Sequence, residues 1–111
     1  MSEDKIQQQI IIYYRNYFQR LYKDCLIFSV PNGGLRDKRT AMLMKATGLT
    51  PGASDLIVIH FGRLLFVECK TATGIQSDEQ KAFAQRVQDC GYQYHLVRSL
   101  DDFKLLLQCQ Q

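Results

Sequence analysis

The sequence contains no long hydrophobic run. None of its apolar stretches approaches the roughly 20 residues that a helix needs to cross a bilayer, and its start has no secretory-signal pattern. We therefore expect a cytoplasmic protein without a membrane partner. Internal repeats, low-complexity tracts and linker-like segments are also absent, so the 111 residues predict a single domain, residues 1–111.

Closely spaced cysteine pairs are missing as well. The four cysteines are scattered along the chain and form no C-x-x-C pair: Cys25, Cys69, Cys90 and Cys109. This spacing argues against a zinc site or a disulfide framework, and it predicts reduced thiols.

Neither sign of charge is in large excess. The formal net charge is +3, and the apolar and charged fractions of 46% and 23% are those of an ordinary globular protein. Such a balance permits a nucleic-acid partner without requiring one, so the placement of the charges matters more than their sum.

The most informative stretch is residues 51–70, P-G-A-S-D-L-I-V-I-H-F-G-R-L-L-F-V-E-C-K. Two apolar runs typical of strands, Leu56–Ile59 and Leu64–Val67, flank a turn that contains Gly62. The stretch therefore predicts a β-hairpin. Because both runs are apolar on both of their faces, we expect central strands that are covered on both sides.

The register of this hairpin brings three charged residues together. With Phe61-Gly62 as a two-residue loop, Asp55 lies opposite Glu68, and such cross-strand partners share a face with Cβ atoms about 4.5–5.5 Å apart. The period of two along a strand places Lys70 on the same face. Like charges directly opposite each other destabilise a sheet, so a divalent cation is the expected compensation for the two carboxylates.

Carboxylates suit hard cations, so we expect Mg²⁺ here, with Mn²⁺ able to replace it. The backbone carbonyl of Cys69 lies between the two side chains and is the expected third ligand, whereas the cysteine sulfur faces the other side of the sheet. A bound metal polarises a phosphoryl oxygen and lowers the pKa of a coordinated water. Lys70 could orient that water or offset the charge that develops on the phosphate.

Helical and strand-like patterns surround the hairpin. A capping box runs from Ser77 to Gln80, and the helix that it starts presents Phe83, Val87 and Cys90 as an apolar stripe. This helix joins the hairpin to the next strand, so that strand is expected to run parallel to the one that ends in Glu68. The expected elements are helices over 3–23, 41–46, 77–90 and 100–109, and strands over 26–30, 56–59, 64–67 and 92–97.

The most basic window of the chain precedes the hairpin. It places four basic residues against Asp37 alone: Arg36, Lys38, Arg39 and Lys45. A solvated helix face explains this window as well as a phosphate-binding element does, so both readings stay open. The same holds for Glu3, which either complements the dipole of the first helix or reaches the acidic site.

Five motifs carry a resemblance that covers nearly the whole chain: E-x-x-I-Q (residues 3–7), P-N-G-G (31–34), G-L-T-P-G-A-S-D-L (48–56), E-C-K (68–70) and S-D-E-Q (77–80). In this order and spacing the chain resembles the PD-(D/E)XK nuclease superfamily and, within it, the stand-alone VRR-NUC domains of phages and bacteria. Where the superfamily motif begins with Pro-Asp, this chain has Ser54-Asp55, with Pro51 three residues earlier.

The resemblance implies an α/β fold with a restriction-endonuclease-like αβββαβ core, in which helices flank a mixed central sheet. It implies that Asp55 and Glu68 bind the metal and that Lys70 is catalytic. It adds Gln80 at the edge of the active site and either Glu3 or Gln7 from the first helix.

The implied function is a metal-dependent endodeoxyribonuclease that cuts branched DNA, with Holliday junctions as the expected substrate, in a bacterial or phage-infected cell. It would act in repair or recombination as a homodimer, with the first and last helices as equal candidates for the dimer surface. A flap or nicking nuclease and a catalytically idle DNA-binding module are the alternatives. The residues expected to contact DNA are Asn32, Gly33, Arg36, Lys38, Arg39 and Lys45.

Overall fold

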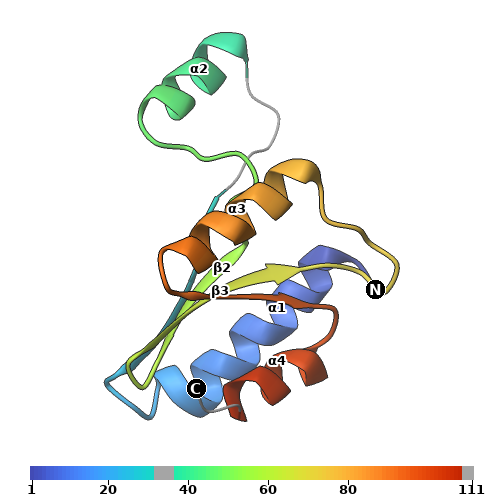
Figure 1. Ribbon diagram of the computed structural model, residues 1–111. Coiled ribbons are helices and arrows are strands. Elements are labelled where there is room, and N and C mark those ends of the chain that lie inside the picture. Colours follow the sequence, from blue (N-terminus) through green and yellow to red (C-terminus); the bar gives the residue numbers. More distant parts are fainter. Residues whose placement is uncertain (32–36, 109–111) are drawn as a thin grey trace.

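A computed structural model describes residues 1–31 and 37–108 (Figure 1). Its elements are α1 (Glu3–Tyr14), the π-helix η1 (Arg15–Gln19), β1 (Cys25–Ser29), α2 (Lys38–Ala46), β2 (Leu56–His60), β3 (Arg63–Cys69), α3 (Asp78–Asp89), β4 (Gln93–Val97) and α4 (Leu100–Gln108). None of the helices in these two ranges is long and apolar enough to cross a membrane.

The four strands form one mixed sheet in the order β1-β2-β3-β4. β1 pairs antiparallel with β2, and β2 pairs antiparallel with β3. β4 lies parallel to β3, because α3 returns the chain across the sheet between the two strands. The predicted αβββαβ order is confirmed, with α2 inserted between β1 and β2 and α4 added after β4.

Polar side chains start the α-helices by accepting backbone N–H groups that have no partner inside the helix. The hydroxyl of Ser2 accepts from Lys5, and that of Ser99 accepts from Asp102, at 3.2 and 3.1 Å. The predicted capping box at the start of α3 is present with both of its hydrogen bonds. Gly48 follows α2 with a φ of +113°, as expected of a residue that ends a helix.

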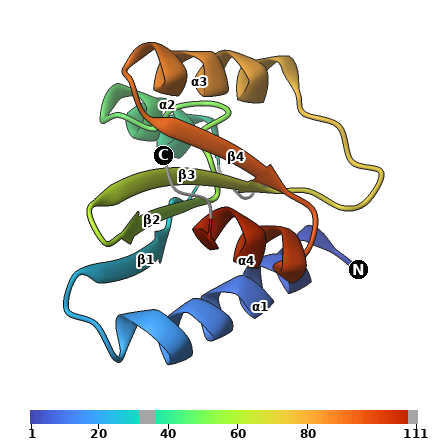
Figure 2. The same cartoon turned by 60° about the horizontal axis from the view of Figure 1, so that its bottom comes forward.

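α1 and α4 lie next to each other across one face of the sheet (Figure 2). Fully buried side chains from these two helices, among them Ile10, Tyr14 and Phe103, meet Val58 and Leu65 from the two central strands. This face forms the hydrophobic core. The opposite face carries α3.

α3 covers only the β3–β4 half of its face. Phe83 of α3 lies edge-on to Phe66 of β3 and to Tyr94 of β4, with ring centroids 6.0 and 6.4 Å apart. On the other half of the same face, Leu26 and Ile59 are 43% and 37% exposed. The expectation that the hairpin strands are covered on both sides is therefore wrong for β2, because no helix seals that half of the sheet within the described residues.

The first helix ends differently from the prediction of one helix over residues 3–23. It becomes the π-helix η1 after Tyr14, and this wider turn keeps Phe18 stacked on Tyr14 at 5.2 Å. Gln19 at its end accepts the backbone N–H of Ile27 at 2.9 Å, on the free edge of β1. The chain thus has no regular α-helical turns after Tyr14, and Gln19 instead satisfies an outward N–H group of the edge strand β1.

One smaller expectation, the burial of Cys90, also fails. Cys90 is exposed rather than part of the apolar stripe of α3, because the helix ends at Asp89 and turns toward β4. His60 and Arg63 pair beside the loop, as the two-residue loop predicts, and β3 continues past the predicted apolar run to Cys69, which pairs with Val97.

The turn that leads into the candidate site is pressed against α3. Gly52 in this turn has a φ of +80°, and a Cβ atom added to it would collide with the backbone of Glu79 and Gln80. Only glycine allows both this conformation and this close approach. The contact fixes the segment before Asp55 against the first turn of α3.

Candidate active site

The hairpin has the predicted register. β2 pairs with β3 from Leu56 opposite Val67 to His60 opposite Arg63, and one further step places Asp55 opposite Glu68. The loop residues Phe61 and Gly62 have φ angles of +49° and +86°. Two consecutive positive φ angles are typical of the tight turn that twists with the strands, which explains why no bulge shifts the register.

Asp55 is held from both neighbouring strands. Its Oδ2 accepts the backbone N–H of Cys69 at 2.8 Å. Its own carbonyl accepts the N–H of Val30 at 2.8 Å, just after β1. The carboxylate therefore has a fixed position at the end of the sheet.

Glu68 is buried beside Asp55, with only 2% of its surface exposed. Its Oε2 accepts a hydrogen bond from the side-chain amide of Gln80 at 3.0 Å. Its Oε1 has no hydrogen-bond partner among the residues that the structure describes. Burial first, and then the charge of Asp55, raise the pKa of Glu68 to about 8. A buried acid with an unsatisfied oxygen is costly unless another group, such as a cation, compensates it.

Lys70, the third charged residue of the candidate site, directly follows β3. Its backbone N–H continues the sheet by donating to the carbonyl of Val97 at 3.0 Å, and alternation along the strand puts its side chain on the face of Glu68. The side chain is 9% exposed. Its positive charge acts to lower the pKa of Glu68, against the larger effects of burial and Asp55.

Gln80 both closes the capping box of α3 and contacts Glu68. Its backbone N–H donates to the hydroxyl of Ser77, and its Oε1 accepts from the N–H of Ser77, at 3.1 and 2.9 Å. The amide nitrogen of the same side chain is then free to donate to Glu68. The capping box thus sets the orientation of the group that holds the buried carboxylate.

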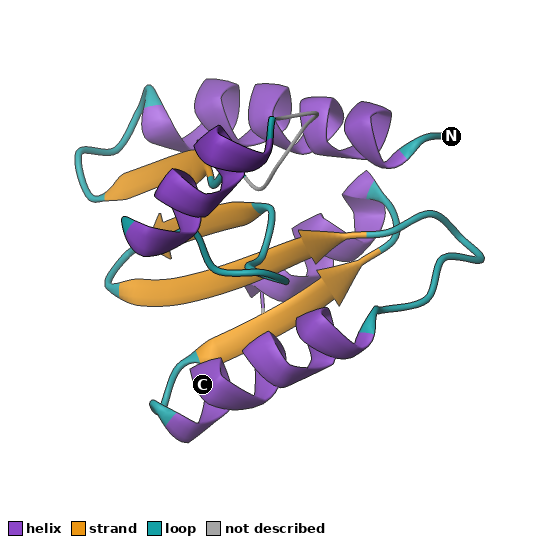
Figure 3. Cartoon of the chain, turned by 90° about the horizontal axis from the view of Figure 1, so that it is seen from above, coloured by secondary structure: helices purple, strands orange, loops and turns teal. Residues whose placement is uncertain are grey.

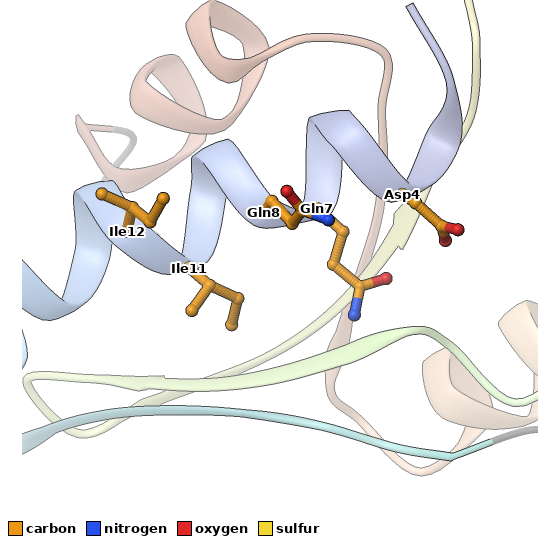
Figure 4. A pocket seen from close by; sticks show the side chains of 5 residues that line it. All are labelled: Asp4, Gln7, Gln8, Ile11 and Ile12. Carbon is orange, nitrogen blue, oxygen red and sulfur yellow. The ribbon is translucent and has the colours of Figure 1, made fainter.

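Glu3 of the first helix acts on the site through its charge. The negative charge of Glu3 raises the pKa of both Glu68 and Cys69, so its carboxylate lies within electrostatic range of the site. Gln7 lines a shallow hollow of about 260 Å³ along α1 together with Asp4 and three further residues, Gln8, Ile11 and Ile12 (Figure 4). Gln7 is uncharged, so which of the two side chains enters the site stays a prediction.

The Cys69 side chain is separate from the site, as predicted. It lies in the hydrophobic core on the α1 side of the sheet. Burial, followed by the charges of Asp55 and Glu68, raises the pKa of its thiol to about 12. The thiol stays protonated at neutral pH, so a metal could meet this residue only through its backbone carbonyl.

The donor set fits a hard cation that keeps much of its water. Within residues 1–31 and 37–108, no group of three His, Cys, Asp or Glu side chains could enclose a metal ion. The ligands predicted from the sequence are the two carboxylates, Asp55 and Glu68, and the backbone carbonyl of Cys69. Mg²⁺ is typically bound through one or two carboxylates plus water and substrate phosphate, so this donor set matches magnesium better than zinc or calcium.

Sequence reasoning missed Tyr94 and Gln76. The hydroxyl of Tyr94 accepts a hydrogen bond from the amide of Gln76 at 3.0 Å. Burial and the charge of Glu68 raise the pKa of Tyr94 to about 12. Tyr94 pairs with Phe66 in the parallel register, so it shares the face of Glu68. Only that register could have revealed this neutral phenol near the carboxylates.

The predicted DNA contacts are only partly described. Lys38, Arg39 and Lys45 are exposed on α2, which stands apart from the sheet (Figure 1). Asn32, Gly33 and Arg36 lie outside the described residues.

The ionisation of Glu68 gives a testable pH dependence. Its pKa in the folded protein, about 8, is raised above the ordinary value of 4.5, so the folded chain binds an additional proton between these values. The stabilisation that this additional proton gives to the folded state is complete below about pH 4.5 and is lost as the pH rises through about 8. We expect the Tm of the metal-free protein in EDTA to fall over this range, and a Glu68→Gln variant to show a flatter profile. Equal profiles would contradict the raised pKa.

One comparison with known proteins, that with solved structures, bears on the fold. No family model matches the sequence, and no curated protein matches it. A solved structure described as "VRR_NUC domain protein" is similar, with a TM-score of 0.77 and 21% sequence identity over 97% of this chain and 86% of that chain. The chain therefore has the VRR-NUC fold that the sequence motifs predicted.

Proposed function

We propose that the chain is a metal-dependent endodeoxyribonuclease of the VRR-NUC family. It cuts branched DNA, with four-way Holliday junctions as the preferred substrate, and it acts as a homodimer in DNA repair or recombination. The observation that carries this proposal is the buried carboxylate of Glu68, which lies beside Asp55 and has one oxygen without a hydrogen-bond partner in residues 1–31 and 37–108. The similarity to the VRR_NUC domain protein supports the same conclusion.

Asp55, Glu68 and the backbone carbonyl of Cys69 are the groups that hold Mg²⁺ or Mn²⁺. When bound, the cation supplies a Lewis acid for a phosphoryl oxygen and lowers the pKa of a coordinated water. The chain fixes both carboxylates beforehand, since the N–H of Cys69 holds Asp55 and the Gln80 amide holds Glu68. Such preorganisation avoids the cost of arranging the ligands during the reaction.

Lys70 acts on the reacting atoms. Its ammonium group, beside the carboxylates, donates hydrogen bonds to the attacking water and to the phosphate oxygens. In the hydrolysis, the water oxygen bonds to phosphorus and the bond from phosphorus to one sugar oxygen breaks. One proton of the water passes through solvent to the leaving sugar oxygen, and the other stays with the phosphate group or goes to solvent. Lys70 offsets the negative charge that builds up on the phosphate during this exchange.

The exposed basic residues of α2 bind the DNA backbone. We expect a Lys38→Ala/Arg39→Ala variant to bind a four-way junction more weakly and to reduce the slope of log affinity against log salt by about 0.9 for each lost phosphate contact. Fluorescence anisotropy across a salt series measures both quantities. The matched control is Arg20→Ala/Lys23→Ala, at two exposed positions beyond η1. An equal loss in both variants would remove α2 from the DNA-binding surface.

Substrate preference separates the proposed enzyme from its alternatives. A four-way junction, a flap and a plain duplex are incubated with the protein and Mg²⁺ at one salt concentration. We expect the junction to be cut fastest. Preferential flap cutting identifies a flap nuclease, and equal cutting of all three identifies a nicking enzyme. Binding without cutting in Mg²⁺ or Mn²⁺ identifies an idle DNA-binding module.

A further inference from the structure

One half of the sheet lacks the helix that its other half has. α3 lies along β3 and β4 (Figure 3), but Leu26 and Phe28 of β1 and Ile59 of β2 remain 43%, 41% and 37% exposed. These three side chains share the face of Phe66, because Phe28 is paired with Ile57 and Ile57 with Phe66. We call Leu26, Phe28 and Ile59 the open sheet face. Large apolar residues clustered in this way mark an interaction surface.

α2 also has large apolar side chains that are exposed. It is the only α-helix in the described part of the chain that buries no side chain. Met42 and Leu43 are 64% and 63% exposed, and they share one helix face with Lys38 and Arg39, which precede them by four residues. An apolar centre flanked by charge is typical of a protein interface. Methionine adapts well to such contacts.

α2 stands away from its own sheet. Seen from above, it projects over β1 and β2 (Figure 3), but Figure 1 shows it raised well above them. The exposure of the open sheet face agrees with this separation. The radius of gyration is 14.5 Å, larger than the about 13 Å expected of a compact chain of this length.

Two outward N–H groups on the neighbouring edge of the sheet already have partners. The outward N–H of Ile27 is bound by the Gln19 side chain, and the N–H of Cys25 is bound by the carbonyl of Tyr22. A partner at β1 therefore meets the face of the sheet rather than its edge. A flat face of leucine, phenylalanine and isoleucine has no donors for a DNA backbone, so it fits an apolar protein surface.

We propose that the open sheet face binds α2 of a second copy of this chain, and that the two copies exchange α2 across a two-fold axis. A two-fold interface must be self-complementary, and this chain carries both halves: an uncovered helix and a sheet half that lacks one. Met42 and Leu43 of each copy cover Leu26, Phe28 and Ile59 of the other. The inference rests on the homodimer of the proposed function and names its surface.

The first test is the mass in solution, measured by light scattering after gel filtration. We expect the wild-type chain to have twice its 12.9 kDa mass. Met42→Gln/Leu43→Gln, which preserves charge and helix propensity, should weaken dimerisation at least tenfold, and Phe28→Gln should do the same. The matched control is Ile12→Gln/Leu105→Gln, on α1 and α4, at two positions that are each 61% exposed. The control should remain dimeric.

The second test distinguishes exchange from closure within one chain. In a background with Cys90→Ser and Cys109→Ser, a Met42→Cys protein is mixed with a Phe28→Cys protein under mild oxidation. Exchange predicts a disulfide-linked heterodimer. The control mixture of Ile12→Cys with Phe28→Cys should form none. A chain that carries both Met42→Cys and Phe28→Cys should link mainly between copies.

Several results would overturn the inference. They are a monomeric wild type, a dimer that survives the α2 substitutions, a control variant that becomes monomeric, or a bond formed only within one chain. Retention of the dimer by Met42→Gln/Leu43→Gln would leave α2 with its proposed DNA contacts alone and would overturn its exchange between copies. None of these readouts needs cleavage, so the inference can fail while the nuclease activity stands, and a dimer without nuclease activity would leave the inference intact.

Discussion

A Glu68→Gln variant should cut DNA at least about a thousandfold more slowly than the wild type in Mg²⁺, and its metal-free form should be more stable. The slower reaction follows from the loss of a metal ligand, and the size is that of removing a group that stabilises transition-state charge. The stabilisation follows because glutamine fills the same space without a buried charge opposite Asp55. Both effects come from the same carboxylate.

The measurements for this variant are single-turnover cleavage and thermal unfolding at pH 8.5 in EDTA. At this pH, Glu68 of the wild type is mostly ionised, since its pKa is about 8. We expect the variant to gain about 1 kcal/mol, which raises Tm by roughly 4–8 °C in a small domain. Junction binding should change little. A lower Tm together with unchanged cleavage would show that Glu68 is a structural residue.

A Gly52→Ala variant should be the most destabilised single substitution in the segment that leads to the site. Alanine is strained at a φ of +80°, and its methyl group would collide with the backbone of Glu79 and Gln80. Strain and overpacking together predict a loss of about 2–5 kcal/mol. Cleavage should fall as well, because the collision displaces the first turn of α3, where Gln80 holds Glu68.

The chain offers a matched control for this prediction. Gly91 has a φ of +90°, but a Cβ added there meets nothing within 4 Å. Gly91→Ala therefore isolates the conformational cost, about 1–2 kcal/mol. Urea unfolding at neutral pH measures both variants. An equal loss of unfolding free energy in Gly52→Ala and Gly91→Ala would mean that the contact with α3 is not close.

The centre of the site was predictable because local rules determine it. A two-residue loop fixes which residues of a hairpin are opposite each other, so Asp55 and Glu68 could be placed from the position of Phe61-Gly62 alone. The capping box at Ser77 was equally local, and it placed Gln80 at the start of α3. The approach of Gln80 to Glu68 came from the family resemblance.

The remaining features depend on contacts between distant parts of the chain. Tyr94 joins the site through the register of two parallel strands, which the intervening helix does not fix in the sequence. The π-helix η1 ends at Gln19, whose side chain accepts a hydrogen bond from the backbone N–H of Ile27. The exposure of one half of the sheet depends on where α2 lies. An apolar strand pattern shows that a residue is suited to burial, but not which partner buries it.

The most direct test of the central claim is cleavage of a mobile four-way junction by the wild-type protein with Mg²⁺, beside the same reaction in EDTA and an Asp55→Ala variant in Mg²⁺. The proposed site predicts paired, symmetric cuts by the wild type in Mg²⁺, no cuts in EDTA, and a variant that still binds the junction but does not cut it. Cutting by Asp55→Ala at the wild-type rate, or undiminished cutting in EDTA, would contradict the assignment of the Asp55–Glu68 pair as a metal-dependent nuclease site.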